Sequence, residues 1–111
     1  MQIEVTSRDM LYMRSLVAGN SYSQGMEIPG PPGTTLRYEG AIESRGVDIP
    51  AVYAFVMSVA TGVTAAIIAD WIRDKFRGRA EKVTINRREI DLDDEGQIRR
   101  VVEEEIQIRP Q

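Results

Sequence analysis

The longest stretch without a charged side chain, residues 49–69, is the feature that most constrains the fold of this 111-residue chain. The run IPAVYAFVMSVATGVTAAIIA holds 21 residues between Asp48 and Asp70. As a helix it would extend about 32 Å, close to the thickness of the hydrocarbon core of a bilayer. Pro50 suits the first turn of a helix, and Gly78 suits its end. We therefore predict a central helix over residues 50–76 that is buried in protein or in lipid.

Small side chains recur at every fourth position of this predicted helix. They are Ala54, Ser58, Gly62 and Ala66. A ridge of small residues allows a second backbone to approach closely, both in water and in a membrane. We predict that this ridge is an assembly interface, and that Gly62→Leu costs roughly 1–3 kcal/mol by overfilling it.

A membrane span over residues 49–69 is the alternative to burial in protein. Tyr53 and Trp71 lie near the two ends of the run, and a basic segment follows, which would place the C-terminal part in the cytoplasm. The many Ala, Thr, Ser and Gly residues lower the hydrophobicity of the run, and Asp70 and Asp74 interrupt its basic flank. These features favour a buried core helix or an oligomer interface, and a single-span protein of the inner membrane remains the alternative.

Composition excludes several kinds of chemistry. The chain has no cysteine and no histidine, so it lacks thiolate nucleophiles, disulfides, the commonest general base and the commonest zinc ligand. The net charge of −3 argues against nucleic acid as a partner. The N-terminus carries Glu4 and Asp9 where a secretory signal needs basic and then apolar residues, so we expect a cytoplasmic protein. We predict no enzyme activity, no cofactor and no metal.

Three weaker motifs have simpler explanations. The stretch GPPGTT at residues 30–35 lacks the lysine of a nucleotide-binding phosphate loop and is expected to be a loop. The acidic run around Asp93 and Asp94 lacks the spacing of a calcium loop and fits helix capping. Asp70 beside Trp71 is expected to pair with a nearby arginine rather than to take part in proton chemistry.

The rest of the chain predicts short strands and helices. Alternating residues predict strands near residues 2–6 and 34–42, and helical spacing from Met10 to Val17 predicts a short helix capped by Ser7 or Asp9. Residues 20–33 are rich in Gly, Pro and Ser and are expected to form a loop.

The C-terminal third predicts a hairpin followed by a helix, over residues 82–108. The strands KVTIN and EIDL are joined by a tight turn in which Asn86 tolerates a positive φ. A final helix presents an apolar face that includes Ile98, Val101 and Val102. The prediction is a single α+β domain over residues 1–111, with the order β-α-β-α-β-β-α and one long apolar central helix packed on a small sheet.

Three segments in order carry a family resemblance: IEVTSRDMLYMRSLV, the close of the apolar run in ADWIRDKFRGR, and the ending KVTINRREIDLDDEGQIRRVVEEEI. Together they resemble the effector-associated constant component family, small bacterial proteins inferred to belong to biological-conflict systems. The resemblance covers most of the chain except residues 20–33. It implies an adaptor or regulatory role and supplies no catalytic residues.

The functional expectation is therefore a non-enzymatic adaptor or accessory module of a bacterial defence or signalling system. It would work as a homo-oligomer or within an effector complex, through the small ridge and through Tyr22 and Met26 in the loop. Two alternatives remain: the single-span membrane protein, and a small inhibitor of the phage or immunity type that blocks an enzyme with its acidic surface.

Overall fold

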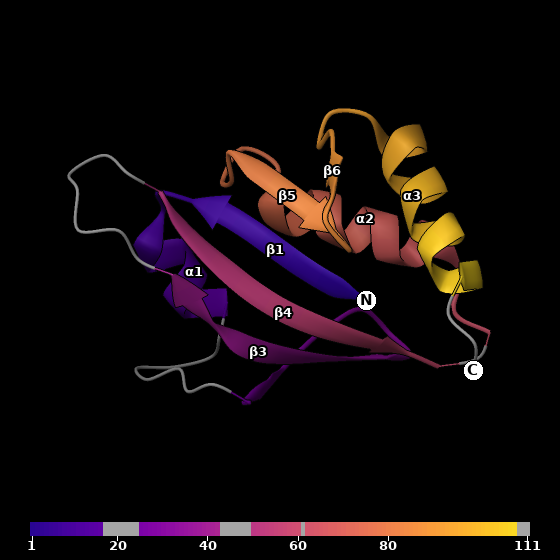
Figure 1. Cartoon of the computed structure of the whole chain (residues 1–111), viewed down its shortest axis with the longest axis horizontal. Coiled ribbons are helices and arrows are strands. Elements are labelled where there is room, and N and C mark those ends of the chain that lie inside the picture. Colours follow the sequence, from indigo (N-terminus) through magenta and orange to yellow (C-terminus); the bar gives the residue numbers. More distant parts are fainter. Residues whose placement is uncertain (17–24, 43–49, 61, 109–111) are drawn as a thin grey trace.

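In the described part of the chain, a six-stranded antiparallel sheet has helices packed on one face (Figure 1). The computed structural model describes residues 1–16, 25–42, 50–60 and 62–108. Among these, the elements follow the order β1 (Gln2–Ser7), α1 (Met10–Leu16), β2 (Glu27–Ile28), β3 (Thr34–Ile42), β4 (Ala51–Val59), α2 (Ala65–Phe76), β5 (Lys82–Ile85), β6 (Arg88–Ile90) and α3 (Glu95–Ile108). The predicted α+β class is confirmed.

The strands lie in the order β2-β3-β4-β1-β5-β6, and each neighbouring pair is antiparallel. The centre of the sheet is therefore the pair of β4 and β1, in which Glu4 stands opposite Ala54 and Thr6 opposite Val52. The N-terminal amino group extends this ladder, since it donates to the carbonyl oxygen of Met57 at 2.7 Å. Figure 1 looks onto the face of the sheet opposite the helical layer, with α2 behind the strands and α3 beside β6.

The core lies between the sheet and the helices. Alternate residues of the central strands point into it, including Ile3 and Val5 of β1 and Tyr53, Phe55 and Met57 of β4, all at most 1 % exposed. The helices contribute an apolar face each, and their buried residues are Met13 of α1, Ile68, Ala69, Ile72 and Phe76 of α2, and Ile98, Val101 and Val102 of α3. Ring contacts between Tyr38 and Phe55 and between Trp71 and Phe76 add directional packing.

The predicted central helix over residues 50–76 is wrong. Residues 51–59 form strand β4, hydrogen-bonded to β3 on one edge and to β1 on the other, and only residues 65–76 form a helix. Gly62, with φ +94°, lies in the connection between them, where a helix cannot continue. Val and aromatic residues dominate the first half of the run and favour a strand, and Ala and Ile dominate the second.

The membrane-span alternative fails with that helix, because half of the run is a paired strand of the sheet. Among the residues whose structure is described, no helix has the length and apolar character needed to cross a bilayer.

Other predicted elements agree with the structure. β1, α1 and β3 occur where the sequence places them, and the hairpin of β5 and β6 is followed by α3. Asp9 caps α1 by accepting from the backbone N–H of Tyr12 at 3.0 Å, and Asp94 caps α3 by accepting from that of Gln97 at 3.0 Å. The predicted loop over residues 20–33 is interrupted by the two-residue strand β2, which sequence analysis missed.

Candidate functional site: the open face of the sheet

The outward face of β4 is apolar, although no described helix covers it. Along β4 the side chains that alternate with the buried ones are Val52, Ala54, Val56 and Ser58. Antiparallel sheets with one solvated face usually carry polar residues on that face. Here the first three outward positions are apolar and half-buried by their neighbours in the sheet.

β3 extends this apolar surface through Ile42, which pairs with Val52 and therefore points to the same side. A β-bulge between Tyr38 and Gly40 sets this register, with Gly40 at φ +116°. Ile42 is 76 % exposed, and its pairing with Val52 makes it part of a contiguous apolar patch rather than an isolated apolar residue. We refer to Ile42, Val52, Ala54 and Val56 as the apolar stripe.

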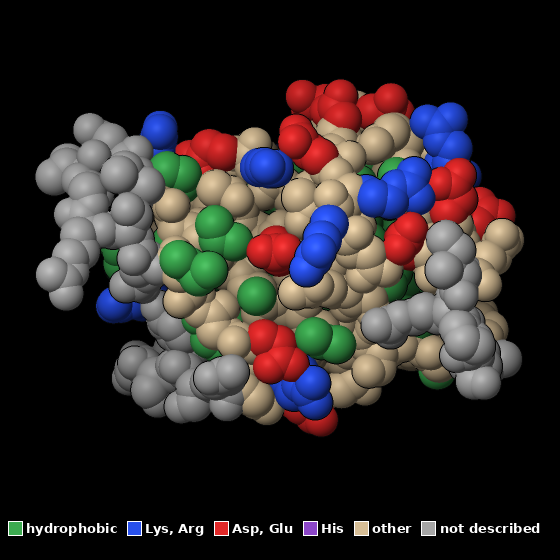
Figure 2. Space-filling view, in the orientation of Figure 1, with side chains coloured by type: hydrophobic (Ala, Val, Ile, Leu, Met, Phe, Trp, Pro, Cys, Tyr) green, Lys and Arg blue, Asp and Glu red, His purple; other side chains and the backbone are tan. Residues whose placement is uncertain are grey.

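Polar side chains border the apolar stripe on both sides. On β1, Gln2, Glu4 and Thr6 stand opposite Val56, Ala54 and Val52. On β3, Arg37 stands opposite Val56. Figure 2 shows this face, with apolar side chains over the sheet interspersed with single acidic and basic groups. An apolar centre with a polar rim is the arrangement typical of protein–protein interfaces.

Most charges on this face are paired within the sheet. Arg37 contacts Glu39 at 2.7 Å on β3, and Lys82 lies 3.8 Å from Glu89 across the β5–β6 hairpin. Glu4 differs, because it forms no ion pair within 4.0 Å with any residue in the described part of the chain. Its neighbours across the sheet are Ala54 and Thr84. Glu27 on β2, which stands opposite Arg37 and farther from the stripe, likewise forms no ion pair within 4.0 Å among the described residues. Of the described residues, Glu4 is therefore the unpaired carboxylate that directly borders the apolar stripe.

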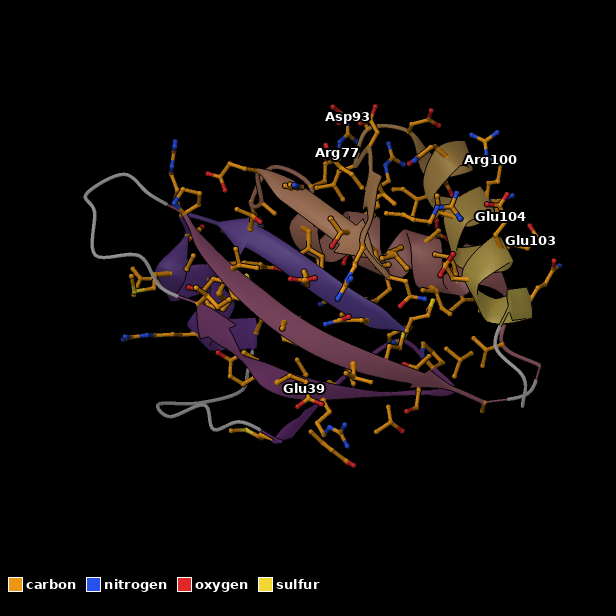
Figure 3. The ribbon with its side chains drawn as sticks, viewed as in Figure 1. Glu39, Arg77, Asp93, Arg100, Glu103 and Glu104 are labelled. Atoms are coloured by element: carbon orange, nitrogen blue, oxygen red, sulfur yellow. The ribbon has the colours of Figure 1, made fainter. Side chains whose placement is uncertain are left out.

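A separate hollow of the described surface lies beside the β5–β6 hairpin. Its volume is about 570 Å³, and the loops before β5 and after β6 line it together with the hairpin. Its acidic groups have structural roles: Asp94 caps α3, Asp91 accepts from the N–H of Asp93, and Asp93 pairs with Arg77 at 2.9 Å (Figure 3). Within the described ranges, no group of three acidic, His or Cys side chains is placed to hold a metal ion.

The backbone edge of β6 at this hollow is already hydrogen-bonded. The side-chain amide of Gln97 donates to the carbonyl of Glu89 at 3.4 Å, and its oxygen accepts from the N–H of Asp91 at 3.0 Å. The Gln97 side chain is therefore hydrogen-bonded to the backbone on both sides of Ile90. A residue in a neighbouring parallel strand would form the same two hydrogen bonds. Gln97 thus protects the edge of the sheet against pairing with another strand.

A buried carboxylate joins the hairpin to α3. Glu105 is 8 % exposed and accepts from the amide of Asn86 at 2.6 Å and from Arg88 at 3.2 Å. Arg88 also contacts Glu104, which is labelled in Figure 3, at 2.8 Å. Hydrogen bonds to Glu104 and then to Glu105 raise the pKa of the Arg88 guanidinium. The cluster holds α3 against the sheet, on the side away from the open face.

The predicted ridge of small residues does not form, because its members lie on different elements. Ala54 and Ser58 point out from β4, exposed Gly62 lies before α2, and half-buried Ala66 lies within α2. Two of the four predicted interface residues therefore lie on the open face, as members of a strand rather than of a helix.

Of the two predicted contact residues of the loop, only Met26 lies among the described residues. Met26 is half-buried and packs against the core, and its carbonyl accepts from the N–H of Tyr38. Tyr22 lies outside the described residues. Asp70 is exposed on α2 and lines a shallow surface hollow with Arg73, Asp74 and Arg77. Among the described residues it forms no ion pair within 4.0 Å, so the predicted pairing with an arginine is not found.

Ile42 and Glu4 are candidate site residues that the sequence alone did not indicate. They could have been found only if residues 51–59 had been assigned as a strand. Alternation along that strand places Val52, Ala54 and Val56 outward. Antiparallel pairing with β3 and β1 then places Ile42 and Glu4 beside them.

Comparison with family models, with curated proteins and with solved structures finds no match for this chain.

Proposed function

We propose that this chain is a non-enzymatic protein-interaction module, a cytoplasmic adaptor or accessory protein, and that the open face of the sheet is its binding surface. The observation that carries the proposal is the apolar stripe on β4, a central strand hydrogen-bonded on both edges. A position on such a strand makes the surface rigid, and rigid apolar surface binds with little loss of conformational entropy.

The energetics of the stripe favour binding. Fully burying a Val or Ile side chain is worth about 1.5–3 kcal/mol relative to leaving it in water. Ile42 is largely exposed and the valines of β4 are half-buried, so a partner that covers the stripe gains part of this free energy at several positions. The role as an adaptor of a bacterial conflict system rests on the family resemblance of the sequence.

A matched pair of substitutions tests the proposal. Val56→Lys places a charge in the stripe, and Ile67→Lys makes the same kind of change at an apolar residue of α2 that is 41 % exposed. Tagged wild-type protein and both variants would be used to recover partners from extracts of the source cells, after their thermal unfolding has been compared. We expect a stoichiometric partner that the wild type and Ile67→Lys retain and that Val56→Lys loses.

Two results would contradict the proposal. One is a partner bound equally by all three proteins, and the other is a partner lost only with Ile67→Lys. Where Val56→Lys lowers the unfolding temperature, Val56→Thr replaces it, because threonine keeps the β-branched shape and changes one methyl group to a hydroxyl.

A further inference from the structure

The uncompensated charge of Glu4 restricts the kind of partner that the open face can accept. Glu4 lies on β1 at the level of Ala54, so it stands beside the middle of the apolar stripe. The other charges of β3, β5 and β6 on this face are paired as Arg37 with Glu39 and Lys82 with Glu89. A partner that covers the stripe also removes water from Glu4, which is unfavourable unless the partner supplies a positive charge or hydrogen-bond donors.

A second copy of the chain does not supply that charge. Glu4 and Gly40 both lie level with Ala54 in the sheet. Consider a dimer in which the open faces of two copies meet, with Ala54 at the centre of the contact. If the two-fold axis runs along the strands, Glu4 of one copy lies opposite Gly40 of the other, next to Glu39. With the axis across the strands, Glu4 faces Glu4 of the second copy. The second arrangement brings two carboxylates together. In the first, the nearest cation, Arg37, is already paired with Glu39 at 2.7 Å. Neither arrangement supplies a free positive charge to Glu4, which disfavours self-association through this face.

From this charge pattern we propose that the occupant of the open face is a segment of another protein that carries a lysine or arginine between two apolar side chains. The inference rests on the proposed function. The cation pairs with Glu4, and the apolar side chains cover Val52 and Val56. These two valines lie two residues before and after Ala54, so they are each about 7 Å along the strand from the level of Glu4.

This spacing defines the recognised pattern. In an extended segment, side chains on one face recur every second residue, which gives the order apolar-any-basic-any-apolar. In a helix, residues four apart are about 6 Å apart, which gives a basic residue with apolar residues four positions before and after it. The negative charge beside the stripe disfavours nucleic acids and other anionic ligands.

Selection from a random peptide display library on immobilised full-length protein tests this inference. The most enriched peptide would be synthesised, and its affinity measured by calorimetry for wild type, Glu4→Gln and Val56→Lys. Glu103→Gln on α3 is the matched control, because it removes the same charge from an exposed position outside the open face. We expect enriched peptides with a basic residue between apolar ones. The affinity of these peptides should fall about tenfold with Glu4→Gln, and it should also fall with Val56→Lys. It should decrease as the salt concentration rises. It should be unchanged with Glu103→Gln.

The remaining outcomes overturn the inference in distinguishable ways. Peptides that lack a basic residue, bind equally to Glu4→Gln and are lost with Val56→Lys would leave the open face as a binding surface but refute the cationic partner. Peptides insensitive to both substitutions would refute the proposed function as well. No enriched peptide, or a wild-type dimer by light scattering that Val56→Lys dissociates, would also refute the inference.

Discussion

At the scale of single residues, Asn86 shows how one side chain fixes both a turn and a tertiary contact. Asn86 and Arg87 connect β5 to β6 with φ values of +48° and +70°, the conformation of a type I′ turn. The Asn86 oxygen accepts from the N–H of Gln2 at 2.7 Å, and its amide donates to Glu105 at 2.6 Å. The turn, β1 and α3 are thereby held together by one residue. The sequence predicted the turn, because asparagine tolerates a positive φ, but it contained no signal for the contact with Glu105.

We expect Asn86→Ala to lower the free energy of unfolding by about 2–3 kcal/mol. Each lost hydrogen bond is worth about 1 kcal/mol, and alanine adopts a positive φ less readily than asparagine. Urea unfolding measures the change, with Arg87→Gly as the control. That control should be neutral or stabilising, because glycine adopts the φ of +70° without strain. Equal losses in the two variants would argue against the contacts described for Asn86.

Tyr12 makes the stability of α1 depend on pH. Its hydroxyl donates to the carbonyl of Lys75 on α2, and the guanidinium of Arg79 lies 4.1 Å from the centre of its ring. Burial raises the pKa of the Tyr12 phenol above its ordinary value of 10.0, and the charge of Arg79 partly offsets this effect. The folded state therefore retains the phenol proton to higher pH than the unfolded state does. The associated stability is fully present below pH 10.0 and is lost as the pH rises through the pKa of the folded state.

Comparing wild type with Tyr12→Phe by urea unfolding at about pH 8 and about pH 11 tests this dependence. At the lower pH we expect Tyr12→Phe to be less stable by about 1 kcal/mol, because it lacks the hydrogen bond to Lys75. At the higher pH the difference between the two proteins should shrink. A difference that is constant or grows with pH would show that the pKa of Tyr12 is not raised in the folded state.

At the scale of elements, the run of residues 49–69 shows why its structure could not be predicted from apolar content alone. A strand with one solvated face is usually recognised by alternating polar residues. On β4 only Ser58 is an outward polar residue, because the other outward residues are Val52, Ala54 and Val56. Without that alternation, the run resembled a continuous buried helix. The apolar outward residues of β4 therefore have two consequences. They form the binding surface that we propose, and they made the strand look like a helix in the sequence.

Gly62 distinguishes the observed structure from the predicted helix. Nothing lies within 4 Å of a Cβ placed on Gly62, and its φ of +94° is unfavourable for other residues. We expect Gly62→Ala and Gly62→Leu to lower the free energy of unfolding equally, each by about 1–2 kcal/mol, because the cost comes from the backbone. Thermal or urea unfolding of both variants checks this. A much larger loss with leucine would indicate the tightly packed ridge of the helical prediction instead.

At the scale of the whole molecule, local patterns predicted most elements but not their arrangement. Alternation predicted β1 and β3, and capping residues predicted the starts of α1 and α3. The strand order depends on contacts between distant segments, such as β1 lying between β4 and β5, and no local pattern encodes them. The candidate site depends on that order, because Ile42, Ala54 and Glu4 become neighbours only across three strands.

We propose that the apolar stripe serves binding rather than folding. The most direct test of this proposal is the affinity of the double variant Val52→Thr/Val56→Thr for a partner that the wild type binds. Both changes keep β-branched side chains on a half-buried surface, so the variant should stay folded while the stripe loses apolar area. We expect the double variant to lose affinity by at least about tenfold, because two buried methyl groups are together worth more than about 1.4 kcal/mol. Unchanged affinity in a folded double variant would contradict it.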